Sequence, residues 1–276
     1  MKRWSAPFIV LAVCSAVVHA DVTIVQKTTL EGGAAAMAGA GVTPPTITSR
    51  IKGLKGRTDM EMGSAGTATT VSTITDAAAK QVIILDHSQK TARVSTPGSK
   101  PPARSPGDPI GTVDGRLTPT GRSQMIDGLK CDEYAFTSSL NVSEFGGGMP
   151  PEVAEAMKDV VMVMKGSIWA SRDAPGAAEY NAYQKAMSSS ELASAAMSAT
   201  GLNMPGAERL IAAMQGVEGL PMLTEIGMTI QGSGQMAETM KQMMGEMKVI
   251  TKVLSVKSDA IPDDVFKVPA GYQVIK

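Results

Sequence analysis

Few residues in this sequence are suited to chemistry. Beyond the first twenty residues the chain has one histidine, His87, and one cysteine, Cys131. Neither lies in a Gly-x-Ser-x-Gly elbow or at the spacing of zinc ligands. Asp132 and Glu133 are adjacent and point to opposite faces of a strand, so we expect solvated charges and not an acid–base pair. Because nucleophilic catalysis needs a base within reach of the nucleophile, the sequence predicts a protein that is not an enzyme and holds no cofactor.

Methionine is the exception in the composition, with 20 residues against 4 phenylalanines. Methionine side chains are flexible and polarisable, so they fill irregular cores without imposing one shape. The same property suits an apolar groove that repacks around ligands of varied form. Both interpretations stay open from the sequence.

Copper binding is an alternative hypothesis, because thioether sulfur is a soft ligand that suits Cu(I). Residues three and four apart share a face on a helix, but not on a strand. The candidate ligands have this spacing and are Met240, Met243, Met244 and Met247.

The N-terminus is typical of a cleavable secretory signal. Lys2 and Arg3 precede an apolar run over 6–18 that is too short to span a membrane, and small residues follow at Val18 and Ala20. We expect cleavage between Ala20 and Asp21 and a mature protein in the periplasm of a Gram-negative-type envelope.

Cys14 is the one candidate for lipidation. Acylated cysteines of bacterial lipoproteins usually follow a small residue, whereas Val13 precedes Cys14. We therefore interpret Cys14 as an apolar residue of the signal. Cys131 is then the one cysteine of the mature chain and cannot form an internal disulfide.

Charge excludes some partners. The chain has 26 basic and 26 acidic residues and no basic run, so we expect no nucleic-acid partner. No later apolar run is long enough for a transmembrane segment. The expected partners are an apolar small molecule or lipid and, as an alternative, another envelope protein.

The elements expected to position these residues are mostly strands. Val, Ile and Thr are frequent, and 55–62 alternates between charged and apolar residues, as in a sheet with one solvated face. Asp127-Gly128 predicts a tight hairpin turn. The predicted strands cover 21–30, 46–51, 55–62, 69–75, 81–85, 91–96, 116–125, 129–138, 162–171, 220–231 and 246–257.

Helices are expected in a smaller part of the chain. A short helix begins at Pro151, and an insertion around 175–217 contains helices over 177–187, over 188–200 and from Pro205. A helical turn is predicted within 232–245. The Gly/Ala stretch 32–41 and the Pro-rich stretch 97–115 are predicted to be mobile loops.

Four segments in this order resemble an uncharacterised family of exported bacterial proteins. They are 128–134 (GLKCDEY), 168–173 (IWASRD), 219–222 (GLPM) and 261–272 (IPDDVFKVPAGY). That family is similar in architecture to the periplasmic carriers of outer-membrane lipoproteins, which hold acyl chains in the concave face of a curved sheet. The resemblance implies a strongly curved antiparallel sheet with a closing C-terminal tail, docked through Ile261, Val265, Phe266 and Val268.

Together these observations predict one α+β, mainly β domain over 21–276. Its curved antiparallel sheet would be an unclosed barrel with a helical cover. We expect it to bind a lipid or acyl chain in the concave face, driven by burial of apolar surface. The alternatives are a Cu(I)-binding protein and a structural or partner-binding envelope module. The candidate lining residues are Met60, Met62, Ile83, Leu85, Met162, Met164, Trp169, Met228 and Ile230.

Overall fold

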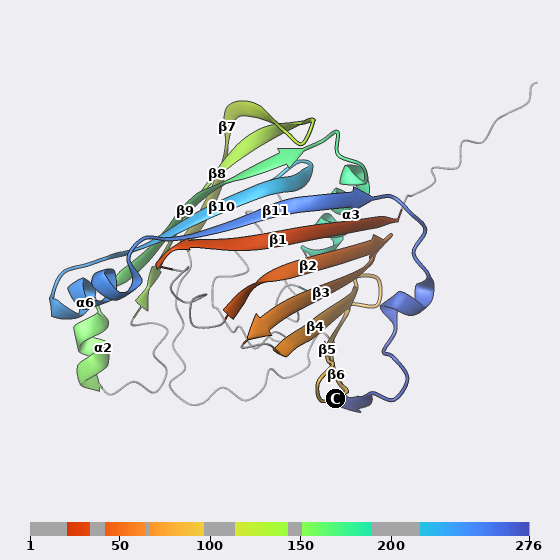
Figure 1. Cartoon of the computed structure of the whole chain (residues 1–276), viewed down its shortest axis with the longest axis horizontal. Coiled ribbons are helices and arrows are strands. Elements are labelled where there is room, and N and C mark those ends of the chain that lie inside the picture. The colour runs from red at the N-terminus through yellow and green to blue at the C-terminus, as the bar shows by residue number, and fades with distance from the viewer. Residues whose placement is uncertain are drawn as a thin grey trace, which may run out of the picture.

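The computed structural model describes residues 21–33, 42–64, 67–96, 114–142, 151–188, 192 and 216–275. These residues form a strongly curved sheet of 12 strands that does not close into a barrel (Figure 1). All neighbouring strands are antiparallel except the short C-terminal strand β12, which pairs with β6 in parallel. The predicted fold class, mainly β with a curved, unclosed antiparallel sheet and few helices, is confirmed.

The strands follow a simple order across the sheet, β12-β6-β5-β4-β3-β2-β1-β11-β10-β9-β8-β7. The chain therefore builds one half as a meander from β1 to β6 and the other half from β7 to β11, and β11 joins the two halves beside β1. The strands are β1 (Val22–Gly32), β2 (Val42–Lys52), β3 (Lys55–Ser64), β4 (Thr67–Asp76), β5 (Gln81–Asp86), β6 (Thr91–Ser95), β7 (Asp114–Ile126), β8 (Leu129–Asn141), β9 (Val161–Ser171), β10 (Leu220–Gln231), β11 (Met247–Lys257) and β12 (Gln273–Ile275).

Local sequence explains the tight turns between strands. Asp127 and Gly128 have φ angles of 50° and 82°, the left-handed geometry that a two-residue hairpin requires and that Asp-Gly adopts readily. After β5, the Asp86 carboxylate accepts hydrogen bonds from the backbone N–H groups of Ser88 and Gln89 at 2.9 and 3.0 Å. This arrangement closes the turn before β6.

Among the described residues, three helices and one 3-10 turn accompany the sheet: α2 (Pro151–Met157), α3 (Ala177–Met187), α6 (Gln235–Met244) and η2 (Asp263–Phe266). Figure 1 shows α2 and α6 at one end of the long strands and α3 at the other. α3 packs against β2 and β10. The sequence predicted α3 with these bounds and a helical segment at α6.

The face covered by α3 is called the inner face. Strand pairing places Val22, Ile51, Gly56, Thr75 and Val82 directly opposite one another in a row on this face. Residues directly opposite one another share a face, and the next residue along each strand points to the other side, the outer face. α3 therefore covers part of the inner face, and the C-terminal tail covers part of the outer face.

The C-terminal tail, defined as residues 258–275, closes the outer face of β3 to β6. Its Ile261 and Phe266 are buried in a cluster with Ile74, Ile83 and Leu85. Other tail residues packed against this cluster are Val265, Val268 and Tyr272. The predicted docking of the tail through its apolar residues is confirmed.

Several predictions concern residues outside those described. They include the signal and its cleavage at Ala20, the chemistry of Cys14, the loops over 34–41 and 97–113, and the helices expected within 188–200 and after Pro205. Asp21, the residue after the expected cleavage, is described. Its carboxylate accepts a hydrogen bond from the Ile261 N–H at 2.7 Å, which joins it to the C-terminal tail.

Candidate functional site

A cavity of about 350 Å³ lies on the inner face between α3 and the first strands. Tyr180, Tyr183, Gln184 and Met187 form its helical wall. Tyr183, Gln184 and Met187 follow Tyr180 by three, four and seven residues, the spacing that puts side chains on one face of a helix. The volume falls within the range of about 300–1,000 Å³ found for small-molecule sites.

The opposite wall is the inner face of β1, β2 and β3. It contributes Ile24 and Ile51 as apolar contacts and Gln26, Ser49 and Thr58 as polar ones. At the β10 side, Leu220 and Pro221 complete the wall. Arg50 and Arg57 also belong to the wall, so the cavity combines apolar residues with a substantial share of polar ones.

Tyr183 fixes α3 over the sheet. Its hydroxyl hydrogen-bonds with the Thr75 hydroxyl, and a Cβ at Gly56 would occupy the position of the Tyr183 hydroxyl. Only glycine at position 56 lets the ring reach Thr75. Gln184 donates a hydrogen bond from Nε2 to the Tyr180 hydroxyl at 2.7 Å.

The tyrosines of this wall are neutral at physiological pH. Burial raises the pKa of Tyr180 and of Tyr183, and this effect outweighs the hydrogen bonds with Gln184 and Thr75, which lower it. A raised phenol pKa keeps the hydroxyl protonated. The helical wall therefore presents hydrogen-bonding groups and no charge.

The polar floor of the cavity is only loosely engaged. The hydroxyls of Ser49 and Thr58 lie 3.4 Å apart, at the long limit for a hydrogen bond. Within the part of the chain that the structure describes, the side-chain amide of Gln26 makes no hydrogen bond. These groups are free to meet a ligand.

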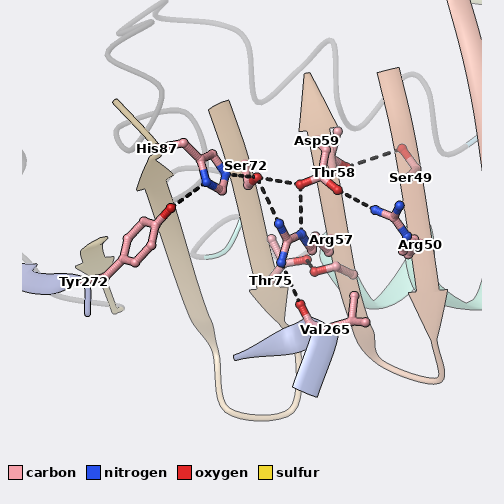
Figure 2. A network of polar contacts seen from close by, with 11 residues as sticks. Ser49, Arg50, Arg57, Thr58, Asp59, Ser72, Thr75, His87, Val265 and Tyr272 are labelled. Atoms are coloured by element: carbon pink, nitrogen blue, oxygen red, sulfur yellow. Dashed lines mark hydrogen bonds and ion pairs between the residues drawn. The ribbon is translucent and has the colours of Figure 1, made fainter. Parts of the chain in front are cut away.

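The outer face of the same strands carries a polar network of a different kind (Figure 2). Asp59 accepts hydrogen bonds from Ser72 Oγ at 2.5 Å and Arg57 Nε at 2.8 Å, and forms a close ion pair with Arg50. Arg57 also donates to the carbonyl oxygen of Val265 at 3.1 Å. The network therefore ties β2, β3 and β4 to the C-terminal tail.

His87 extends this network to Tyr272. His87 Nε2 lies 2.6 Å from Ser72 Oγ, and Nδ1 lies 2.6 Å from the Tyr272 hydroxyl (Figure 2). Ser72 gives its one proton to Asp59, so in the neutral imidazole Nε2 carries the proton and Nδ1 accepts from Tyr272. With this tautomer, each donor in the series Tyr272, His87, Ser72 has one acceptor, and the series ends at Asp59.

This order of groups differs from that of a hydrolytic triad, although it contains an aspartate, a serine and a histidine. In a triad the histidine stands between the serine and the carboxylate. Here Ser72 stands between Asp59 and His87, and Ser72 is fully buried beneath the tail. The arrangement holds the tail in place and offers no accessible nucleophile.

The charge balance of the network favours ionised Asp59. Burial of the carboxyl acts to raise its pKa, but hydrogen bonds from Ser72, Arg57 and Arg50 and the charge of Arg57 outweigh burial. The pKa of Asp59 therefore lies below its usual value.

The predicted lining residues separate onto the two faces. Met60 lies on the inner face, two residues along β3 from the cavity residue Thr58. Ile83 and Leu85, also predicted as lining, lie on the outer face, packed beneath the tail with Phe266, and do not line the cavity. Alternation along β5 explains this placement. Val82 is paired with the inner-face residue Thr75, so the next residue, Ile83, and then Leu85 point to the outer face. The side chain of Met62 lies outside the described set.

Four further lining candidates do lie together, but at the end of the sheet near α6. Met164 and Met228 are directly opposite each other, with Met247 next in the row, and Met162 is opposite Ile230 in the following row. Alternation along β1 places the partner of Met247, Gly32, on the inner face. The hollow bordered by Met162, Met228, Ile230 and Met247 leaves no room for a water molecule. Ile230 and Met247 are buried, whereas Met162, Met164 and Met228 are half-buried.

Trp169 is buried in the main core and does not line the cavity. Arg122 lies over its ring, 5.9 Å from Arg122 Cζ to the ring centroid, and also pairs with Glu133. The Glu133 side chain is 4% exposed, so the expectation of a solvated charge is wrong for this residue. Hydrogen bonds from Arg122 and Thr120 compensate for its burial.

The four candidate copper ligands do not share one helical face. α6 ends at Met244, and Gly245 has a φ angle of 56°, so Met247 already belongs to β11. Met240 packs against the cluster that contains Ile230 and Ala237. The side chains of Met243 and Met244 lie outside the described set.

The sequence reasoning missed the residues that form the cavity. The Tyr180, Tyr183 and Met187 spacing within a predicted helix is a local signal for one shared face. Gln26 occupies the next inner position of β1 after the apolar residues Val22 and Ile24, and this change to a polar residue is also visible in the sequence. Which helix face meets which strands is set by the fold alone.

Comparisons with known proteins give no further assignment. No protein-family model matches the chain, and no curated protein sequence matches it. Among the described residues, no helix is long and apolar enough to cross a membrane. Within the same residues no three His, Cys, Asp or Glu side chains gather as a metal site would require.

Proposed function

We propose that this chain is an exported, periplasmic protein that binds an apolar ligand, a lipid or acyl chain, in the cavity between α3 and β1–β3. The single observation that carries the proposal is the cavity itself, with its apolar and tyrosine walls. The resemblance to the lipoprotein-carrier architecture and the curved sheet agree with it. We propose no catalysis.

The driving force is burial of the ligand's apolar surface. Each Å² removed from water contributes about 25 cal/mol before the costs of association are subtracted. Ile24, Ile51 and Met187 supply apolar contacts from both sides of the cavity. The hollow beside the methionine rows near α6 has no room for a ligand, so the ligand is proposed to bind at the opposite end of the inner face.

Two measurements test the proposal. The mature protein, purified gently from an envelope fraction, is expected to carry lipid detectable by mass spectrometry. After delipidation it is expected to bind the neutral fluorophore N-phenyl-1-naphthylamine and to release it when an acyl lipid is added.

A matched pair of variants locates the binding site. Ser49→Phe places a ring in the cavity and should abolish probe binding. Thr29→Phe adds the same ring to an exposed position of β1 and should leave binding unchanged. A lipid-free protein that also fails to bind the probe, or equal binding by the two variants, contradicts the proposal.

A further inference from the structure

Gln26 is the one amide in an apolar row that crosses the inner face. The row runs through Val253, Gln26, Ile47, Met60 and Val71, each directly opposite the next. Gln26 lines the cavity, and its amide makes no hydrogen bond within the described chain. Gln26 is half-buried, and its amide carries two donors and a strong acceptor, so a ligand that covers the amide without pairing with it costs free energy.

The side chains that neighbour Gln26 on the inner face supply hydrogen bonds from neutral groups. Ser49 and Thr58, its neighbours on the cavity floor, are neutral hydroxyls. Arg50 and Arg57 also belong to the wall, but alternation along β2 and β3 directs their side chains to the outer face, where both bind Asp59. Among the described wall residues no other side chain is ionised, so a carboxylate bound on the inner face would have no cation in direct contact and its desolvation would be costly.

We infer that the cavity selects acyl lipids that carry an uncharged carbonyl or hydroxyl group, such as an acyl ester, and that the Gln26 amide recognises this group. The inference rests on the function proposed above. Gln26 donates from its NH₂ to the ligand oxygen, while the chain lies against Ile24, Ile51 and the helical wall. A plain hydrocarbon leaves the amide unpaired, and a free carboxylate lacks a cation.

Competition against N-phenyl-1-naphthylamine tests the selectivity, with methyl laurate, laurate and dodecane as competitors of matched chain. The wild type is expected to bind methyl laurate more tightly than the other two. Gln26→Met keeps the shape of the side chain and removes its hydrogen bonds, so methyl laurate should bind about tenfold more weakly while dodecane binds at least as well.

Gln26→Glu separates hydrogen-bond donation from mere polarity, because it keeps the size of the side chain and replaces the donor by an acceptor. Gln26→Glu should bind methyl laurate more weakly than the wild type, as Gln26→Met does. Gln124→Met, on an exposed position of β7, is the control and should bind all three competitors as the wild type does. Thermal unfolding should show Gln26→Met at least as stable as the wild type.

The outcomes distinguish this inference from the function on which it rests. If the wild type binds no probe, the proposed function fails and the inference falls with it. If the probe binds and Ser49→Phe blocks it, but methyl laurate binds Gln26→Met as tightly as the wild type, only the role of Gln26 is overturned.

Discussion

The two faces of β2 and β3 have opposite characters, although their residues alternate along the same strands. On the inner face, Ser49 and Thr58 border a cavity of about 350 Å³. On the outer face, Arg50, Arg57 and Asp59 lie in a network whose hydrogen bonds extend to the tail. A fully engaged face stabilises the fold, whereas a face with space and loosely engaged polar groups is available for a ligand.

The space left on each side makes the comparison quantitative. A hollow beside the outer apolar cluster, next to Ile74 and Phe266, measures about 40 Å³. That volume suits a water molecule or two and no lipid. Substitutions on the outer face should therefore change stability alone, and substitutions on the inner face should change ligand binding.

The largest expected effect is on the outer face, at Phe266. Phe266→Ala removes a buried ring from the cluster beneath the tail and should lower the free energy of unfolding by roughly 4 kcal/mol. Urea denaturation measures the change. Val274→Ala, at a half-exposed position in β12, is the control and should change it by no more than about 0.5 kcal/mol. Equal effects of the two would mean that the tail does not pack as described.

Asp59→Ala should destabilise the protein by about 3 kcal/mol, because it leaves Arg50 and Arg57 without their common partner. Asp263→Ala removes an exposed carboxylate from Lys52 and should change stability little. Probe binding by the folded fraction should be unchanged in both variants. A specific loss of probe binding in Asp59→Ala would show that the outer-face network and the cavity are coupled, which contradicts the separate roles of the two faces.

On the inner face, Gly56→Ala should cost about 2 kcal/mol, because its methyl group displaces the Tyr183 ring. The same substitution in a Tyr183→Ala background should cost clearly less, since the ring is already gone. Unfolding of the four proteins in this cycle gives the coupling energy. Additive effects would show that α3 does not rest on Gly56.

The smallest expected effect is a pH dependence from Asp59. Its pKa is lowered on folding, so the stability it contributes is present above the ordinary value of 3.8 and is lost as pH falls through the folded-state pKa. The difference in unfolding free energy between the wild type and Asp59→Asn should be constant from neutral pH to about pH 5 and should shrink in stronger acid. A difference that grows on acidification would reverse the assigned sign.

Much of the fold follows from local patterns in the sequence. Alternation in β3, the β-branched residues of β1 and the Asp127-Gly128 turn each predict their element, and the composition of 177–187 predicts α3. The sequence does not predict which side chains of β5 point to which face of the sheet, because Val82, Ile83, Ile84 and Leu85 form a continuous apolar run without a period of two. Such a run indicates a strand covered on both sides, which the tail explains.

The sites are less predictable than the elements. Tyr272 and His87 are separated by 185 positions in sequence, and no local pattern links them. The methionines suggested a groove by composition, but their cross-strand pairing packs them against one another at the end near α6. The cavity depends on where α3 docks, which is a property of the whole chain.

The most direct test of the inner face as a ligand site is photo-crosslinking with an acyl probe that carries a diazirine in its chain, followed by peptide mapping. The account predicts crosslinks to α3 and to the inner-face residues of β1–β3, and their loss in Ser49→Phe but not in Thr29→Phe. Crosslinks to the outer cluster beneath the tail, or to the methionine rows near α6, would contradict it.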